Sequence, residues 1–249
     1  MFKLGIIDMS NLAYISGFSR QVLAGNLSIE EDVLSRIDNL NNYHLETLYF
    51  AFDSKILYKQ IMFKQFYKAT RHDKESAEEK GYRDKIYAAL RNLRLKVLPY
   101  KGWKDFVLIQ TGYEADDIIA EFVTQNPKSV IVSSDTDYYQ LLDRAAFILN
   151  PMTFVQTDKR RLLLSKGLRP EEWPMYRSLV GKTGEIDGVY GVGPKTAMKI
   201  LGGQKIPDKV QAEMDKSQGK IKRNLKMTEM PFQCNIPLKL KLKGHHESP

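Results

Sequence analysis

The sequence has little cysteine and histidine and no long apolar run. Cys234 is the one cysteine among 249 residues, so no internal disulfide can form, which favours a reducing, cytoplasmic setting. No apolar run approaches the ~18–20 residues that a membrane span requires. The opening residues, MFKLGIIDMSN, contain too short an apolar stretch for a signal peptide. We therefore expect no membrane partner and no disulfide framework.

The length and the hydrophobic content of 43% suit one compact domain with a sizeable core, or one domain with a small appendage. A boundary is predicted between residues 150 and 167, because a stretch rich in glycine and turn residues follows it. This divides the chain into a first region, 1–160, and a second region, 161–249. The tail at 238–249 alternates apolar and basic residues, as in an edge strand or a loose basic end, and we assign it no function.

The positive charge is concentrated in one segment. The whole chain carries a formal charge of +8, and residues 55–104 contain 14 Lys/Arg against 5 Asp/Glu, a net of +9. The remainder therefore sums to −1. Such a concentration favours a polyanionic partner, most often nucleic acid, although a solvated basic helix face gives the same count.

Three apolar runs are typical of buried strands of a parallel sheet: residues 3–7 (KLGII), 47–52 (TLYFAF) and 129–132 (SVIV). Residues 146–149 could add a fifth strand, and 106–110 a fourth, although the latter reads equally as a loop or the start of a helix. Helical patterns at 76–95 and 115–123 lie between the runs. An α/β fold is expected.

Each of the first three runs ends at an acid: Asp8, Asp53, and the pair Asp135 and Asp137. In an open parallel sheet the carboxyl ends of the strands face one crevice. A single Asp there is often only a turn or cap residue. The segment GYEADD at 112–117 adds three more acids at the start of a helix, where the helix dipole explains one or two of them.

Seven carboxylates in one crevice would have to take up protons, unless multivalent cations neutralise them. Oxygen ligands without His or Cys favour Mg²⁺ or Mn²⁺ over Zn²⁺. Two such ions about 3.5–4 Å apart activate the attacking water and stabilise the leaving oxygen in displacement at phosphorus. The cluster therefore predicts a metal-dependent phosphodiesterase.

Two further motifs predict contacts with nucleic acid. In YKATR, Lys68 and Arg71 could hold the reacting phosphate, and Tyr67 could stack on a base or simply pack in the core. In GVGPKTA, Gly191 and Gly193 permit a turn with positive φ, and the following helix offers free N–H groups to a phosphate. The predicted nucleic-acid contacts are Tyr67, Lys68, Arg71, Gly191, Gly193, Lys195 and Thr196.

The ordered set IIDMSN, FAFD, YKATR, GYEADDIIA, SSDTDYYQLL and GVGPKTAMKIL resembles the flap-endonuclease family of 5′-nucleases. The compact bacteriophage 5′-3′ exonucleases and the 5′-nuclease domain of bacterial DNA polymerase I are the most similar branches. The likeness runs from about residue 3 to about residue 201.

The resemblance implies a PIN-like catalytic domain with a helical arch at about 74–94, and a C-terminal helix-three-turn-helix that binds duplex DNA, with K⁺ at its hairpin. It implies cleavage of 5′ flaps or 5′ ends near duplex junctions, with RNA/DNA hybrids as further substrates, by a monomer in the cytoplasm (the host's, if a phage encodes it). Lys68 and Arg71 match the family's basic pair at the base of the arch. Expected metal ligands are Asp8, Asp53, Glu114, Asp116, Asp117, Asp135 and Asp137, with Glu185 and Asp187 as substitutes at the second ion.

One departure from the family pattern lies before the hairpin. The family has two aspartates there that complete the second metal site, whereas this chain reads GKTGEIDGV at 181–189, one residue shorter. Lys182 stands where the first aspartate belongs in one alignment, and in the other that aspartate has no counterpart. We therefore expect the second ion to bind weakly or not at all. Two alternatives remain: a flap- or junction-binding protein with weak or lost catalysis, and a different PIN-like RNA nuclease.

Overall fold

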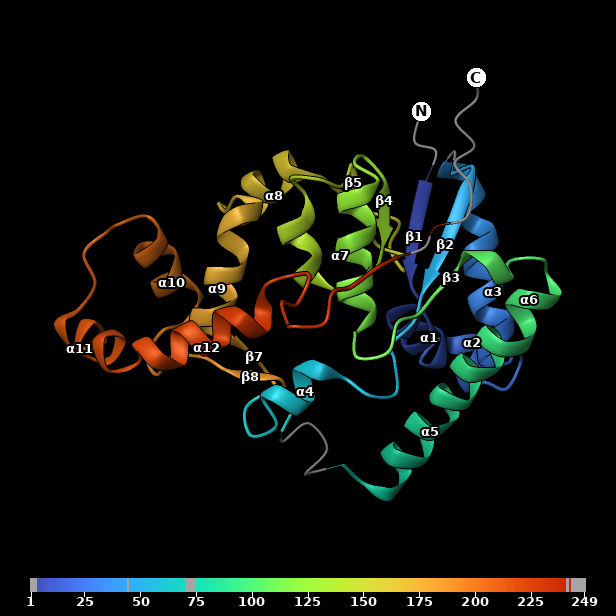
Figure 1. The fold of residues 1–249 in the computed structure, drawn as a ribbon, viewed down its shortest axis with the longest axis horizontal. Helices are drawn as coiled ribbons and strands as arrows, with labels where there is room; N and C mark the ends of the chain where they lie inside the picture. Colours follow the sequence, from blue (N-terminus) through green and yellow to red (C-terminus); the bar gives the residue numbers. More distant parts are fainter. Residues whose placement is uncertain (1–3, 44, 70–74, 241, 243–249) are drawn as a thin grey trace.

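The computed structural model describes residues 4–43, 45–69, 75–240 and 242. A six-stranded sheet lies at its centre, with the strand order β3-β2-β1-β4-β5-β6 (Figure 1). The neighbours from β3 to β5 are parallel, and β6 is antiparallel to β5. The strands are β1 Leu4–Asp8, β2 Thr47–Ala51, β3 Val107–Leu108, β4 Val130–Val132, β5 Phe147–Leu149 and β6 Gln156–Thr157.

The predicted strands are confirmed, and the ambiguous run at 106–110 contains the short strand β3. Both predicted helices are present, as α5 and α7. The helices are α1 Met9–Gly17, α2 Arg20–Leu23, α3 Ile29–Asn39, α4 Tyr58–Met62, α5 Ala77–Asn92, α6 Leu98–Tyr100, α7 Ala115–Gln125, α8 Lys159–Lys166, α9 Trp173–Val180, α10 Pro194–Leu201, α11 Asp208–Lys216 and α12 Gln218–Thr228.

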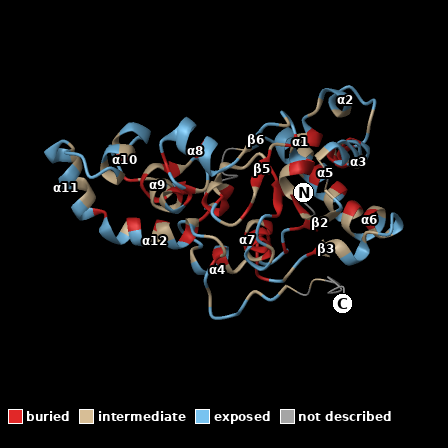
Figure 2. Cartoon of the chain, turned by 90° about the horizontal axis from the view of Figure 1, so that it is seen from above, coloured by how far each residue is buried: buried red, intermediate tan, exposed pale blue. Residues whose placement is uncertain are grey.

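The core lies on both faces of the sheet, because successive strand residues point to opposite sides. Ile6 and Ile131 pack with α7 on one face. Ile7 and Phe50 pack with α1, α3 and α5 on the other. Buried residues are concentrated in the sheet and α7, whereas α10 and α11 are mostly exposed (Figure 2). The sheet is thus fixed from both sides, which gives its carboxyl edge a defined geometry.

The region after residue 160 contributes to two cores. Leu162, Leu168 and Trp173 pack into the core on the α7 side of the sheet. Helices α9, α10 and α12 enclose a smaller core of their own, which includes Leu179 and Ala197. The division at residue 160 stays a prediction. Among the described residues, no helix has both the length and the apolar character needed to cross a bilayer.

The C-terminal segment returns from α12 to the sheet (Figure 1). Phe232 is buried, and Leu238 and Leu240 pack against the core on the α7 side. The Gln110 side chain contacts the segment through its amide, which donates to the Pro237 carbonyl (3.2 Å) and accepts from Lys239 N (3.0 Å). Up to residue 240 the tail is therefore packed against the domain, without forming an edge strand.

Gly112, which begins the GYEADD segment, is joined to the chain before α4. Its N–H donates to the Ile56 carbonyl (3.0 Å), and its own carbonyl accepts from Tyr58 N (2.7 Å). Its φ is +96°, and a Cβ added there would lie 1.9 Å from the Tyr58 ring. The glycine thus lets α4 approach the start of α7 closely.

Gly112→Ala is expected to destabilise the fold more than Gly102→Ala. Gly102 also has a positive φ (+81°), but an added Cβ would meet nothing within 4 Å. The control should lose about 1–2 kcal/mol from backbone strain alone, whereas Gly112→Ala should lose about 1–3 kcal/mol more from the clash. Urea unfolding measures both, and equal losses would show that close packing at Gly112 is unimportant.

Candidate active site

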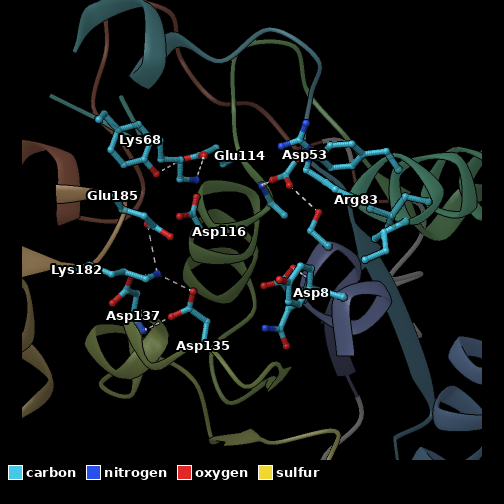
Figure 3. Close-up of a pocket in the computed structure, with 18 of the residues that line it drawn as sticks. Asp8, Asp53, Lys68, Arg83, Glu114, Asp116, Asp135, Asp137, Lys182 and Glu185 are labelled. Atoms are coloured by element: carbon cyan, nitrogen blue, oxygen red, sulfur yellow. Dashed lines mark hydrogen bonds and ion pairs between the residues drawn. The ribbon is translucent and has the colours of Figure 1, made fainter. Parts of the chain in front are cut away.

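A cleft of about 1320 Å³ lies beyond the carboxyl edge of the parallel strands, with α5 forming one wall. A two-stranded hairpin, β7 Gly181–Lys182 and β8 Ile186–Asp187, borders the cleft as well. Most of the predicted ligands converge there (Figure 3), namely Asp8, Asp53, Glu114, Asp116, Asp135, Asp137 and Glu185. The expectation that the strand ends share one crevice is therefore confirmed.

Asp187 does not belong to this group. The preceding residue of β8, Ile186, is buried and lines the cleft, whereas the Asp187 side chain is exposed. Because neighbouring strand residues point to opposite faces, Asp187 faces away from the site. The prediction that Asp187 replaces a missing ligand is wrong in this structure.

Asp8 is buried at the end of β1, where it also caps α1. Its Oδ1 accepts from Asn11 N (3.0 Å), and its Oδ2 accepts from the Tyr138 hydroxyl (2.9 Å). Burial raises the pKa of Asp8 to about 6, against the opposing hydrogen bond from Asn11, and the nearby charge of Asp53 adds to the rise. A bound cation would relieve this cost of ionisation.

Asp53 and Asp135 are oriented by backbone N–H groups. Asp53 Oδ1 accepts from Ala115 N (2.7 Å), at the first residue of α7, and its Oδ2 accepts from Ser10 Oγ (2.6 Å). Asp135 caps the 3₁₀ helix at Thr136–Leu141, where its Oδ1 accepts from Asp137 N (2.9 Å). Both aspartates therefore accept backbone N–H groups and also line the cleft, where their role as metal ligands stays a prediction.

Glu114, Asp116 and Asp117 lie at the start of α7, around the ammonium of Lys59. Lys59 Nζ is 3.0 Å from Glu114 Oε2, 3.7 Å from Asp116 Oδ2 and 3.7 Å from Asp117 Oδ1. Burial alone would raise the pKa of Glu114, but Lys59 and Lys68 hold it well below its ordinary value. A lysine thus supplies part of the positive charge that the sequence assigned to metal ions.

Both carboxylate oxygens of Asp117 accept hydrogen bonds from backbone N–H groups. Its Oδ1 accepts from Phe232 N (2.7 Å), and its Oδ2 accepts from Glu114 N (3.4 Å). The side chain is 1% exposed and does not line the cleft. We assign Asp117 a structural role instead of the predicted place among the metal ligands.

Asp116 differs from its two neighbours because one of its oxygens is unsatisfied. Its Oδ1 is buried and has no hydrogen-bond partner among the residues that the structure describes, although Asp116 lines the cleft. Burial raises the pKa of Asp116 well above its ordinary value, only partly opposed by Lys59. A buried carboxylate oxygen without a donor is what a hard cation such as Mg²⁺ would satisfy. The residues around it fit such an ion.

Lys182 occupies the other side of the acid cluster (Figure 3). Its Nζ is 2.7 Å from Asp137 Oδ2, 3.0 Å from Asp135 Oδ2 and 3.4 Å from Glu185 Oε2. The remaining oxygen of Asp137 accepts from Arg177 Nε at 2.7 Å. Burial opposes ionisation of Asp137, but Lys182 and Arg177 lower its pKa. Both oxygens of Asp137 are therefore paired with cationic side chains.

Lys68 reaches the cleft, whereas Tyr67 does not act as a stacking surface. Lys68 Nζ donates to Glu114 Oε1 at 2.6 Å. Tyr67 is 5% exposed, and its hydroxyl donates to Glu114 Oε2 at 2.7 Å. The prediction that Tyr67 stacks on a base is wrong in this structure, because the ring is buried with Ile186 and Met227. Arg71, the other predicted phosphate contact, lies outside the described residues.

The GVGPKTA segment forms an exposed helix start, as predicted. Pro194 is the first residue of α10, and Lys195 is exposed. Gly191 has the predicted positive φ (+76°), but Gly193 has φ −87° and ψ 179°. Gly193 is the N-cap, a position that takes an extended backbone, so the expectation of a second left-handed glycine is wrong. The α10 N–H groups remain available to an anion.

The roles of Lys59 and Arg177 were not predicted from the sequence. Lys59 belongs to the basic segment, but nothing in its neighbours distinguishes it from the exposed Lys55 and Lys64. Arg177 follows an apolar helical pattern, where a basic residue usually faces solvent. Their partners are far away in the chain, so neither residue had a local signal.

Ionisation of Asp8 should destabilise the metal-free protein as pH rises. Because the pKa of Asp8 is raised to about 6 from 3.8, its neutral form stabilises the fold fully below about pH 4, and this contribution is lost as pH rises through 6. Asp8→Asn should therefore stabilise the metal-free chain by about 1–3 kcal/mol above pH 6. Urea unfolding in chelator at several pH values measures the difference.

Asp158→Asn is the matched control, since Asp158 is an exposed cap that accepts from Arg161 N (2.7 Å). It should show no gain above pH 6. If Asp8→Asn gave no pH-dependent gain over this control, the account of a costly buried carboxylate at Asp8 would be wrong.

Solved structures share the fold over almost the whole chain. The structure of T5 5′-exonuclease with bound zinc superposes with a TM-score of 0.78 at 20% identity, covering 92% of this chain and 90% of that one. The complex of the T5 flap endonuclease with DNA and metal ions gives a TM-score of 0.72, also at 20% identity, covering 92% of this chain and 89% of that one. At this identity the likeness shows the fold, a mixed α/β architecture of the resolvase-like type.

Curated relatives match by sequence. The 5′-3′ exonuclease of Aquifex aeolicus is 35% identical over 144 residues, which are 50% of this chain and 49% of the relative. The thermostable DNA polymerase I of Thermus aquaticus is 39% identical over 95 residues, which are 36% of this chain and 11% of the relative. The chain thus spans about half the length of the first relative and a small part of the second.

The family model of the 5′-3′ exonuclease N-terminal resolvase-like domain matches residues 6–166, which include the end of β1 and every acid of the cleft except Glu185. The strand-end carboxylates in one cleft and the shared fold agree with this match. The chain therefore belongs to the 5′-3′ exonuclease family, through a resolvase-like N-terminal domain at residues 6–166.

Proposed function

We propose that the chain is a metal-dependent 5′-nuclease that hydrolyses DNA phosphodiesters near junctions of single and double strands. The observation that carries this proposal is the unsatisfied Oδ1 of Asp116 in a cleft that Asp8 and Asp53 also line. A purely DNA-binding protein would have no need to bury an unpaired carboxylate oxygen beside two further acids, because they repel the phosphate that it binds.

Mg²⁺ or Mn²⁺ is the cation that we expect, held by Asp8, Asp53 and Asp116 with Asp135 beside them. The donor set consists of carboxylate oxygens, which these hard ions prefer. When bound, the ion would polarise the phosphate and lower the pKa of the attacking water. Asp53 and Asp135 are pre-oriented by N–H donors, so little side-chain freedom would be lost when the ion binds.

The chain's own cations would hold the substrate. Lys68 lies in the cleft within 2.6 Å of Glu114, from where its ammonium can contact a phosphate oxygen. The N-terminus of α10, with Gly193 and Lys195 exposed, would bind a backbone phosphate of the duplex. A K⁺ ion at the GVGPKTA turn that precedes α10 is part of the same proposal. One contact positions the reacting phosphate and the other fixes the duplex arm.

The printed descriptions of similar proteins support 5′ ends and flaps as substrates: an exonuclease in Aquifex aeolicus and a flap endonuclease bound to DNA in phage T5. RNA/DNA hybrids, a monomeric state and a cytoplasmic location extend the proposal. The alternative, a junction-binding protein with lost catalysis, rests on the altered site around Lys182.

The second ion is where this chain is expected to depart from a two-metal mechanism. Lys182 already lies between Asp135 and Asp137, and its ammonium would repel a divalent cation there. We propose that this side of the site works with a fixed ammonium in place of a second ion. Lys182 would then stabilise negative charge on the phosphate, with less polarising power than a divalent ion.

Asp116→Asn should reduce cleavage of 5′-labelled flap DNA in Mg²⁺ by at least about 100-fold, because it removes the unsatisfied charge that faces the cation. Flap binding in Ca²⁺ should change by less than about twofold, since Asp116 holds no part of the duplex contact. Asp187→Asn, a carboxylate of the same chain outside the cleft, is the control and should cleave normally. Tight binding by the wild type without cleavage in Mg²⁺ or Mn²⁺ would favour the alternative function.

Lys182→Asp should raise the cleavage rate at limiting Mg²⁺ by about tenfold, about 1.4 kcal/mol, by opening a second cation position between Asp135 and Asp137. Thr183→Asp adds a carboxylate to an exposed neighbour and should leave the rate unchanged. The titration of rate against Mg²⁺ is the measurement. Neither a faster rate nor a lower half-saturating Mg²⁺ concentration in Lys182→Asp would refute the proposed role of Lys182.

A further inference from the structure

Lys59 is an almost fully buried cation, with a side chain that is 2% exposed. It lies in α4, which is joined to the GYEADD segment by the hydrogen bond from Tyr58 N to the Gly112 carbonyl (2.7 Å). A parallel bridge between Leu57 and Gly112 fixes the same approach. These backbone contacts therefore hold Lys59 close to the start of α7, independently of its side-chain contacts.

The position is unfavourable for a cation without acidic partners. The N-terminus of a helix carries partial positive charge, and burial removes the water that would solvate an ammonium. Three acids offset this cost of burying the ammonium. Oxygens of Glu114, Asp116 and Asp117 lie 3.0, 3.7 and 3.7 Å from Lys59 Nζ. The rings of Tyr67 and Phe232, with centroids at 5.4 and 5.7 Å, cover the ammonium.

The three acids differ in what else they contact. Asp117 uses its oxygens for Phe232 N and Glu114 N. Glu114 accepts from Tyr67 and Lys68. Asp116 is held by Lys59 on Oδ2, and within the described part of the chain its Oδ1 has no hydrogen-bond partner. Only Asp116 is thus both anchored by Lys59 and open to a further ligand.

We propose that Lys59 is a positioning residue of the proposed nuclease site: its ammonium is a fixed internal cation that gathers Glu114, Asp116 and Asp117 at the start of α7 and directs Asp116 Oδ1 to the ligand of the cleft. The oxygens of the three acids lie within 4.8 Å of one another, as ligands of one ion would. In this chain the Lys59 ammonium occupies the position between these three acids, and the proposed divalent cation binds on the other side of Asp116. This proposal rests on the proposed function for its catalytic consequence only.

Lys59→Met keeps the length of the side chain and removes its charge. Three buried acids then lose their cation, so the melting temperature should fall by roughly 10 °C. The kcat of flap cleavage should fall at least about tenfold, with the Kd for flap DNA in Ca²⁺ changed less than about twofold. Lys59→Arg should restore most of both quantities. Lys64→Met, the same change at an exposed lysine of the same segment, should alter neither.

A double variant separates charge from packing. Lys59→Met combined with Asp117→Asn removes one positive and one negative charge, so the net charge of the buried group is that of the wild type. If Lys59 acts through its charge, the second change should recover part of the lost melting temperature and at least about fivefold of the lost kcat. If Lys59 only fills space, the two losses should add.

The proposal is overturned if Lys59→Met behaves like Lys64→Met, or if the losses in the double variant add. A single variant that does not fold leaves the comparison to the double variant, and failure of the double variant to fold as well would also overturn it. The melting temperatures need no cleavage. A wild type that does not cut flap DNA would therefore refute the proposed function and leave the test of Lys59 intact.

Discussion

The rest of the site depends on how the protein neutralises the carboxylates that its sheet brings together. The parallel strands end at acids, and the start of α7 adds three more on the same edge. Repulsion in such a group would open the cleft or protonate its members. Two lysines reduce this repulsion, each within 4 Å of three carboxylates: Lys59 near the start of α7 and Lys182 on the β7–β8 hairpin.

This internal compensation decides what remains for an added cation. Asp137 is paired on both oxygens, and Asp117 is committed to the backbone. Asp8 keeps a raised pKa, and Asp116 keeps an oxygen that no donor among the described residues satisfies. This is the basis of the proposal of one divalent ion near Asp116, with Lys182 as a fixed positive charge on the far side.

The sequence predicts the sheet and the position of the acids well, because both follow from local pattern. Apolar runs mark the strands, and an Asp after each run marks the edge where they meet. The identity of the neutralising cations does not follow, since Lys59 and Lys182 contact acids that are distant in sequence. The predictions of base stacking by Tyr67 and of a positive φ at Gly193 failed for a related reason. Tertiary contacts bury the Tyr67 ring, and the helix start sets the φ of Gly193, so residue type alone does not decide either property.

The basic segment at residues 55–104 is less available to nucleic acid than its charge indicates. Its net charge of +9 predicted a surface for nucleic acid, yet Lys59 is buried and Lys68 is paired with Glu114 inside the cleft. Part of the segment's charge balances the chain's own acids. The exposed start of α10 would be a separate contact, so the proposed duplex binding and the proposed chemistry lie on different elements (Figure 1).

The most direct test of a single divalent site is anomalous diffraction from crystals soaked in Mn²⁺. The account predicts one strong peak bounded by Asp8, Asp53 and Asp116, and none between Asp135 and Asp137 where Lys182 lies. Absence of the first peak, or a second ion that displaces the Lys182 ammonium, would contradict it.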